Sequence, residues 1–124
     1  MMNNNMNATI SQIESRIFTI RNMQVMLDNH LAELYGVETK QINRAVKRNI
    51  ARFPETFMFQ LKTAEWENLK CQIGTSSSDH GGKRKLPFVF NEQGVAMLSA
   101  VLRSKTAIKV SKRIKLIEIN YIHE

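Results

Sequence analysis

The sequence predicts an α+β fold: a small helix-turn-helix-like domain with short antiparallel strands and a C-terminal helix. Short runs rich in β-branched and aromatic residues alternate with segments whose apolar residues recur at helical spacing. The chain has 124 residues, of which 43% are hydrophobic, and no internal repeat is visible. This size and composition fit one compact domain with a modest core.

The chain is expected to begin with a polar, disordered tail over residues 1–15. The segment MMNNNMNATISQ lacks the cationic leader and the apolar core of a signal or transit peptide. Its composition is typical of a flexible terminus. We expect the compact domain over residues 16–106 and a separate C-terminal helix over residues 107–124.

The first two strands are expected in RIFTIRNMQVML. Two β-prone runs flank Arg21 and Asn22, and asparagine tolerates the positive φ of a tight hairpin turn. The segment therefore predicts an antiparallel hairpin.

A helix is expected next, in LDNHLAELYGVET. Leu27, Leu31 and Leu34 recur at helical spacing. Asp28 can cap the start of this helix, and Gly36 can end it.

A second helix is expected almost immediately afterwards. Thr39 is a suitable N-cap, and Ile42, Val46 and Ile50, together with Ala45, form an apolar stripe. The stripe predicts a helix that reaches to about Ile50 with these residues turned inward.

Helical order is expected to end at Pro54. Phe57, Phe59 and Leu61 then recur with the period of two that marks a half-buried strand. Thr63 is expected to cap a short helix over TAEWENLK.

A loop, a strand and two helices complete the predicted fold. The run GTSSSDHGGKRK predicts a mobile loop over residues 72–85, and a strand should reach from Pro87 to Phe90. Asn91 is expected to cap a helix over NEQGVAMLSAVL, and a last helix carries an apolar stripe that packs on the domain or on a partner. The buried positions expected on these helices are Val95, Leu98, Val101 and Leu102, and then Ala107, Val110, Ile114, Ile117 and Tyr121.

The charge of the chain favours an anionic partner. There are 18 Lys and Arg against 11 Asp and Glu, which gives a formal net charge of +7 and a pI near 9.9. Most of the basic residues lie in three segments without an intervening acid, at residues 40–52, 83–85 and 103–115. Such clustering is typical of a protein that binds nucleic acid.

The two consecutive helices carry the spacing of a helix-turn-helix. A small side chain at Ala32 lets the second helix pack closely, and Gly36 permits a left-handed turn. Ile42 and Ala45 or Val46 can anchor the second helix against the first.

The outward face of the second helix has the chemistry of a DNA-contacting surface. Arg44 can donate a bidentate pair to guanine, Asn43 can pair with adenine, and lysines can neutralise phosphates. Solvation of an ordinary surface helix is the alternative explanation for each of these side chains. The candidate DNA-binding residues on this helix are Thr39, Lys40, Asn43, Arg44, Lys47 and Arg48.

Three further candidates, Lys83, Arg84 and Lys85, stand in the predicted loop. If the strands on either side of the loop pair, the loop would project like a wing and contact phosphate or the minor groove. Solubility of a long loop explains these cations equally well.

The sequence shows no catalytic or metal-binding motif. Cys71 is a lone cysteine, and His30, His80 and His123 have no companion at a metal-ligand spacing. We therefore expect no enzyme activity, no metal and no cofactor. The lone cysteine fits a reducing cytosol, and no apolar run approaches the roughly 18 residues of a membrane span.

Three strings, VMLDNHLAELYGVETK, NRAVKRNIARFPETFMFQL and EQGVAMLSAVLRS, occur together and in order. Over about residues 16–110 the chain resembles the phage antirepressor-type DNA-binding domain called the open-reading-frame-six N-terminal domain, a relative of the KilA and Bro N-terminal domains. The resemblance implies a regulatory DNA-binding role in phage or prophage biology, in a bacterial cytoplasm and on the nucleoid when DNA is bound. It also supports the candidates on the second helix. After AIKVS the chain departs from the resemblance, because RIKLIEINYIHE stands where a longer continuation is expected. The implication of full antirepressor activity is weaker for that reason.

The expected function is sequence-specific binding of double-stranded DNA by a transcriptional regulator or antirepressor of phage or prophage origin. The alternative is a protein-interaction module that binds a repressor, or forms a homodimer through the stripe over residues 107–121, with weak or incidental DNA binding. RNA binding is less favoured because Phe57, Phe59 and Phe88 are expected in the core and not on a stacking platform.

Overall fold

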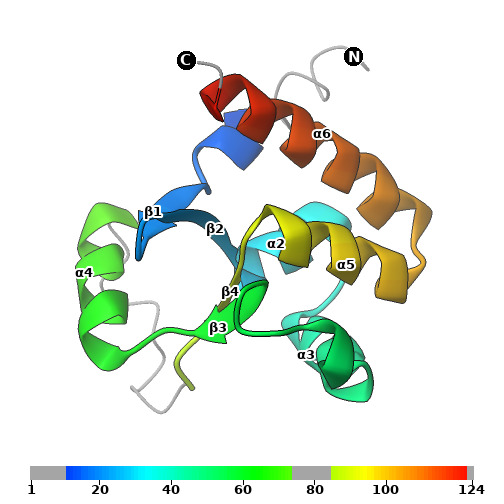
Figure 1. Cartoon of the computed structure of the whole chain (residues 1–124), viewed down its shortest axis with the longest axis horizontal. Helices are drawn as coiled ribbons and strands as arrows, with labels where there is room; N and C mark the ends of the chain where they lie inside the picture. The colour runs from blue at the N-terminus through cyan, green and yellow to red at the C-terminus, as the bar shows by residue number, and fades with distance from the viewer. Residues whose placement is uncertain (1–10, 74–84, 123–124) are drawn as a thin grey trace.

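The computed structural model describes residues 11–73 and 85–122, and side chains up to residue 117 (Figure 1). Residues 11–14 are helical. The elements that follow are β1 (Phe18–Ile20), β2 (Met23–Leu27), α2 (Asp28–Tyr35), α3 (Thr39–Arg48), the 3-10 helix η1 (Ile50–Arg52), β3 (Met58–Gln60), α4 (Thr63–Ile73), β4 (Phe88–Phe90), α5 (Glu92–Leu102) and α6 (Lys105–Ile122). The predicted α+β class, with short antiparallel strands and a C-terminal helix, is confirmed.

The strands form one antiparallel sheet in the order β1-β2-β4-β3. The predicted hairpin is confirmed, since β1 pairs with β2 and the turn residues Arg21 and Asn22 have φ of 55° and 64°. Arg21 also fixes this turn on α4. Its Nε and Nη2 donate to the two carboxylate oxygens of Glu65 at 2.8 and 3.0 Å, and its guanidinium lies 4.0 Å from the Phe59 ring centre.

The sheet separates two hydrophobic clusters. Met26, Met58 and Phe90 point to the larger cluster, which α2, α3, α5 and α6 share. Their neighbours Leu27 and Phe59 point to the smaller cluster under α4. The expectation of a half-buried strand at residues 57–61 was therefore incomplete, because helices cover both faces of the sheet and neighbouring residues on opposite faces are buried.

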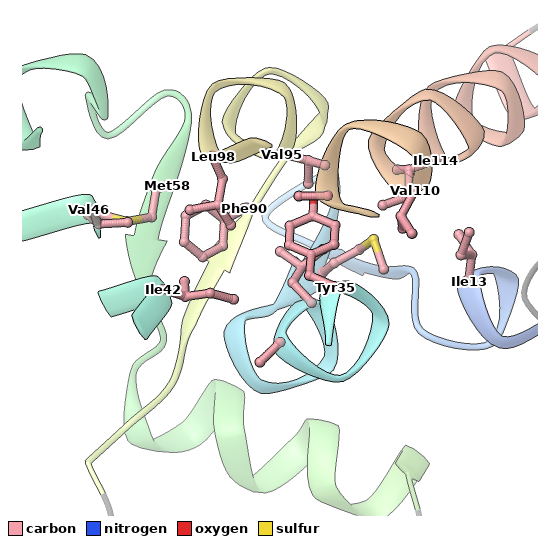
Figure 2. Packing of buried hydrophobic residues seen from close by; sticks show 14 of the residues in the cluster. Ile13, Tyr35, Ile42, Val46, Met58, Phe90, Val95, Leu98, Val110 and Ile114 are labelled. Atoms are coloured by element: carbon pink, nitrogen blue, oxygen red, sulfur yellow. The ribbon is translucent and has the colours of Figure 1, made fainter. Parts of the chain in front are cut away.

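Figure 2 shows the larger cluster as a continuous row from Val46 and Met58, past Phe90 and Tyr35, to Ile114 and Ile13. Ile13 is fully buried, and residues 11–14 form a helical turn. The predicted disorder of the tail over residues 1–15 is therefore wrong for these four residues. A single apolar residue among polar neighbours gives no periodic signal, so only its distant partners identify it as core. Residues 1–10 lie outside the described part of the chain.

The helix over TAEWENLK is longer than predicted. α4 extends to Ile73, so residues 72 and 73 belong to the helix and not to the predicted loop. Thr63 is its first residue and not its cap. The N–H of Lys62 donates to Glu65 Oε1 at 2.8 Å and satisfies the helix start instead. The remainder of the predicted loop, residues 74–84, lies outside the described residues.

α5 packs closely on the sheet. The predicted cap is confirmed, since Asn91 Oδ1 accepts from the N–H of Gly94 at 2.9 Å and Asn91 Nδ2 donates to the carbonyl of Thr56 at 2.6 Å. A Cβ at Gly94 would collide with the carbonyl oxygen of Phe57. Glycine therefore allows α5 to approach the start of β3.

α6 packs on its own domain. Its buried residues join α2 and α5 in the larger cluster, and Figure 1 shows the helix running across the end of the domain. Four of the five expected stripe residues are buried, namely Ala107, Val110, Ile114 and Ile117. The side chain of the fifth, Tyr121, lies outside the described side chains. On α5, Val95 and Leu98 are buried and Val101 and Leu102 are half-buried.

Candidate nucleic-acid interface

The turn between α2 and α3 has the conformation that the sequence predicts. Gly36 has a φ of 73°, and the N–H of Val37 donates to the carbonyl of Ala32 at 3.0 Å. Ala32, Ile42 and Val46 are buried at the contact between the two helices. This packing fixes which face of α3 points to solvent.

Both predicted helix starts need correction by one residue. Glu38, not Thr39, is the N-cap of α3, and its N–H donates to Gln41 Oε1 at 2.8 Å. Leu27, not Asp28, is the N-cap of α2. Each predicted capping residue is instead the first helical residue, so its side chain is available for other contacts.

The end of α3 contradicts the predicted inward position of Ile50, which is 59% exposed. Asn49 leaves the helical conformation and its Nδ2 donates to the carbonyl of Ala45 at 2.8 Å. The chain then turns through η1 and brings Phe53 into the core, edge-on to Phe90 with ring centres 6.1 Å apart. The stripe stops at Val46 because a side-chain bond ends the helix before the next apolar position.

The outward face of α3 carries two rows of side chains. Residues four apart lie on the same side of a helix, which groups Thr39 with Asn43 and Lys47, and Lys40 with Arg44 and Arg48. Thr39 is half-buried and the other five are exposed. Lys40 Nζ lies 3.5 Å from Glu38 Oε1, an ion pair whose two side chains are 68% and 69% exposed. The structure thus brings all six α3 candidates to one exposed surface.

The row of Thr39, Asn43 and Lys47 lines a groove of about 740 Å³. Residues 85–88 line the same groove, so Lys85 borders it together with this row of α3. Val46, Ile50 and Met58 contribute apolar surface to the same groove. Lys83 and Arg84 lie outside the described residues.

Asp28 also lines this groove. The carboxylate is 5% exposed. Its Oδ1 accepts from the N–H of Asn29 at 2.6 Å, and its Oδ2 accepts from the N–H of Phe88 at 3.3 Å. The start of α2 is thereby joined to Phe88 at the start of β4, which also lines the groove.

The end of the groove near α2 includes Arg16, His30 and Glu33. Arg16 Nη2 donates to Glu33 Oε1 at 3.0 Å. Burial, with a further contribution from Arg16, lowers the pKa of His30 to about 4, so this imidazole is neutral at pH 7. Sequence reasoning missed Arg16, because only the fold brings the segment before β1 next to α2.

The described residues include no group of three or more His, Cys, Asp or Glu side chains placed to hold a metal ion. Among the described helices, none combines the length and apolar character needed to cross a membrane.

A family model described as the ORF6N domain matches residues 15–101. No curated protein and no solved structure gives a significant match to the chain.

Proposed function

Because the chain belongs to the ORF6N domain family, which is related to phage antirepressors, we propose that it binds double-stranded DNA in a sequence-specific manner through α3. We propose that it acts as a transcriptional regulator or antirepressor of phage or prophage origin, by binding and not by catalysis or with a cofactor. The observation that carries the proposal is the outward face of α3, where six polar or cationic side chains lie opposite an apolar side that is buried in the core.

The dimensions of α3 suit the major groove. Its ten residues give a length of about 15 Å, and the major groove of B-DNA is about 12 Å wide and admits an α-helix. Ile42 is fully buried and Val46 is 6% exposed, so the domain holds the helix rigidly from behind. A rigid support favours contacts to base edges, because the side chains then start from fixed positions.

Both rows of α3 contribute to the proposed base and phosphate contacts. Arg44 can donate two parallel hydrogen bonds to guanine O6 and N7, and Asn43 can pair with adenine N6 and N7. Lys40, Lys47 and Arg48 supply charge for phosphates on either side of the groove. Lys85 lines the same 740 Å³ groove, and we propose that it contacts a phosphate of the same DNA.

Selection of DNA from fragments of bacterial and prophage genomes, followed by sequencing of the retained fragments, tests this proposal. A sequence-specific binder enriches a common short motif, and Asn43→Ala should change the preference at one position of that motif. The matched control is Asn68→Ala, which changes an exposed asparagine on α4, away from the groove. Retention of no fragments at low salt would contradict DNA binding, and retention without a common motif would contradict sequence specificity.

Two exposed apolar side chains support a second candidate function. Ile108 is 42% exposed and Leu116 is 63% exposed, and both lie on the side of α6 that the core does not use. They favour contact with a repressor or with a second copy of the chain. The buried stripe of α6 is occupied by its own domain, so this contact would use the outer side of the helix. A change in oligomer mass with Leu116→Asp, and unchanged DNA binding, would support this candidate.

A further inference from the structure

The first half of α6 carries cations that the proposed α3 contacts do not use. Lys105, Lys109 and Arg113 line a hollow on the surface, together with Glu33 and Leu34 of α2. Lys105 and Lys109 are exposed and Arg113 is half-buried. These side chains therefore point along the side of α6 that adjoins α2.

The hollow beside α6 shares a lining residue, Glu33 of α2, with a hollow beside α3. A second hollow, between α2 and the start of α3, is lined by Glu33, Thr39 and Lys40 among others. Glu33 lines both hollows and the groove described above. Figure 1 shows α2 lying between α6 and α3, behind α5. We call this surface, from α6 across α2 to α3, the α2 face.

The acids on the α2 face are already engaged. Glu33 pairs with Arg16 at 3.0 Å, and Glu38 pairs with Lys40 at 3.5 Å. Asp28 is buried and accepts two backbone N–H groups. Among the described residues, no acid of this face forms an ion pair with Lys105 or Lys109, so these lysines add positive potential beside the α3 surface.

Helix stability does not explain these lysines. Lys105 is the first residue of α6, and the first turn contains no acid. The N-terminus of a helix carries partial positive charge, so cations at this end are unfavourable. The helix is capped instead by Ser104 Oγ, which accepts from the N–H of Ala107 at 3.2 Å.

We propose that Lys105 and Lys109 contact the phosphates of duplex DNA beside the base pairs that α3 contacts. The inference rests on the proposed function and extends its surface from α3 across α2 to α6. Such contacts position the protein on the duplex and add affinity that is independent of sequence.

The test compares two double variants of the full chain, Lys105→Gln with Lys109→Gln, and Lys112→Gln with Lys115→Gln. Both remove two exposed positive charges from α6, but only the first pair lines the α2 face. Binding to a selected duplex is measured by fluorescence anisotropy at several salt concentrations. The slope of log K against log salt should become shallower by about 0.9 for each lost phosphate contact. The slope for the first variant should therefore be shallower than the wild-type slope by about 1.8. The control should keep the wild-type slope.

A thermal melt separates contact from folding. Loss of Lys105 and Lys109 should leave the melting temperature unchanged or higher, because both lysines are exposed and Lys105 opposes the helix dipole. A shorter duplex that lacks the flanking base pairs should bind the wild type and the first variant equally.

Three outcomes are informative. Equal slopes for the wild type and the first variant would overturn the α6 contact and leave the proposed function intact. An equal loss in the control variant would also overturn it, because net charge alone would then explain the effect. A wild-type chain that binds no duplex would overturn the proposed function, and the α6 contact with it.

Discussion

The Asp28 carboxylate accepts a hydrogen bond from the backbone N–H of Phe88, with Oδ2 and N 3.3 Å apart, although Phe88 follows Asp28 by 60 positions in the chain. This bond joins the start of α2 to the start of β4. It also continues the contact of β2 with β4, whose last pair is Leu27 with Val89. One buried carboxylate thus connects the helix that supports α3 to Phe88, which lines the same groove.

Removal of this carboxylate should destabilise the fold. Asp28→Ala leaves the N–H groups of Asn29 and Phe88 without their acceptor, and an unsatisfied buried donor costs about 1–3 kcal/mol. Asp28→Asn keeps one acceptor oxygen and should lose less. Urea denaturation followed by circular dichroism measures both losses. Equal stability of Asp28→Ala and wild type would show that the bond contributes nothing.

The Arg21 and Glu65 pair should make stability depend on pH in the acid range. The hydrogen bonds from Arg21 and from the N–H of Lys62 lower the pKa of Glu65 from 4.5 to about 2. A lowered folded-state pKa gives stability that is present above pH 4.5 and is lost as the pH falls towards 2.

Glu65→Gln should flatten the dependence of the unfolding free energy on pH between these two values. Arg21→Gln should flatten it similarly, because it removes the largest cause of the shift. Urea titrations at a series of pH values check this. A slope in Glu65→Gln as steep as in the wild type would assign the acid sensitivity to other groups.

Gly36 and Gly94 should respond differently to alanine. Gly36 has a φ of 73° with open space around an added Cβ, so Gly36→Ala should cost only the left-handed strain of about 1–2 kcal/mol. Gly94→Ala meets the backbone of Phe57, and relief of this overlap must move α5, at a cost of about 1–3 kcal/mol or more. Chemical denaturation should rank Gly94→Ala as the less stable variant. The reverse order would contradict the close approach of α5 to β3.

Lys47 should matter more for DNA binding than Lys40. The Lys40 ammonium lies 3.5 Å from a Glu38 oxygen, so that carboxylate would stay near any phosphate that Lys40 contacts. In the described part of the chain, no carboxylate forms such a pair with Lys47. Lys47→Gln should therefore weaken binding more than Lys40→Gln, in anisotropy titrations under identical salt. Equal losses would indicate that the Glu38 pair opens on binding.

The sequence predicted the features that depend on neighbouring residues. The turn at Arg21 and Asn22, the left-handed Gly36 and the Asn91 cap are each set by chemistry within a few positions. The outward direction of the α3 candidates followed from Ile42 and Val46, which are buried as expected.

Features that depend on distant contacts could not be predicted in this way. Ile50 continues the apolar stripe in sequence, yet Phe53 occupies the core because Asn49 ends the helix first. Ile13 is buried only because α6 returns beside it. In the same way, Asp28 resembles a helix cap in sequence, and its bond to Phe88 exists only in the folded chain.

The affinity of the double variant Arg44→Glu with Lys47→Glu for duplex DNA tests most directly whether α3 contacts the DNA. The matched control is Lys112→Glu with Lys115→Glu, which makes the same change in net charge on exposed residues of α6. Both variants should keep the far-ultraviolet circular dichroism spectrum and the oligomer mass of the wild type. If α3 is the DNA-contacting helix, the first variant loses specific binding and part of the salt-dependent affinity, and the control retains its sequence preference. If the α3 variant still selects the same motif with wild-type affinity, α3 is not the DNA-contacting helix.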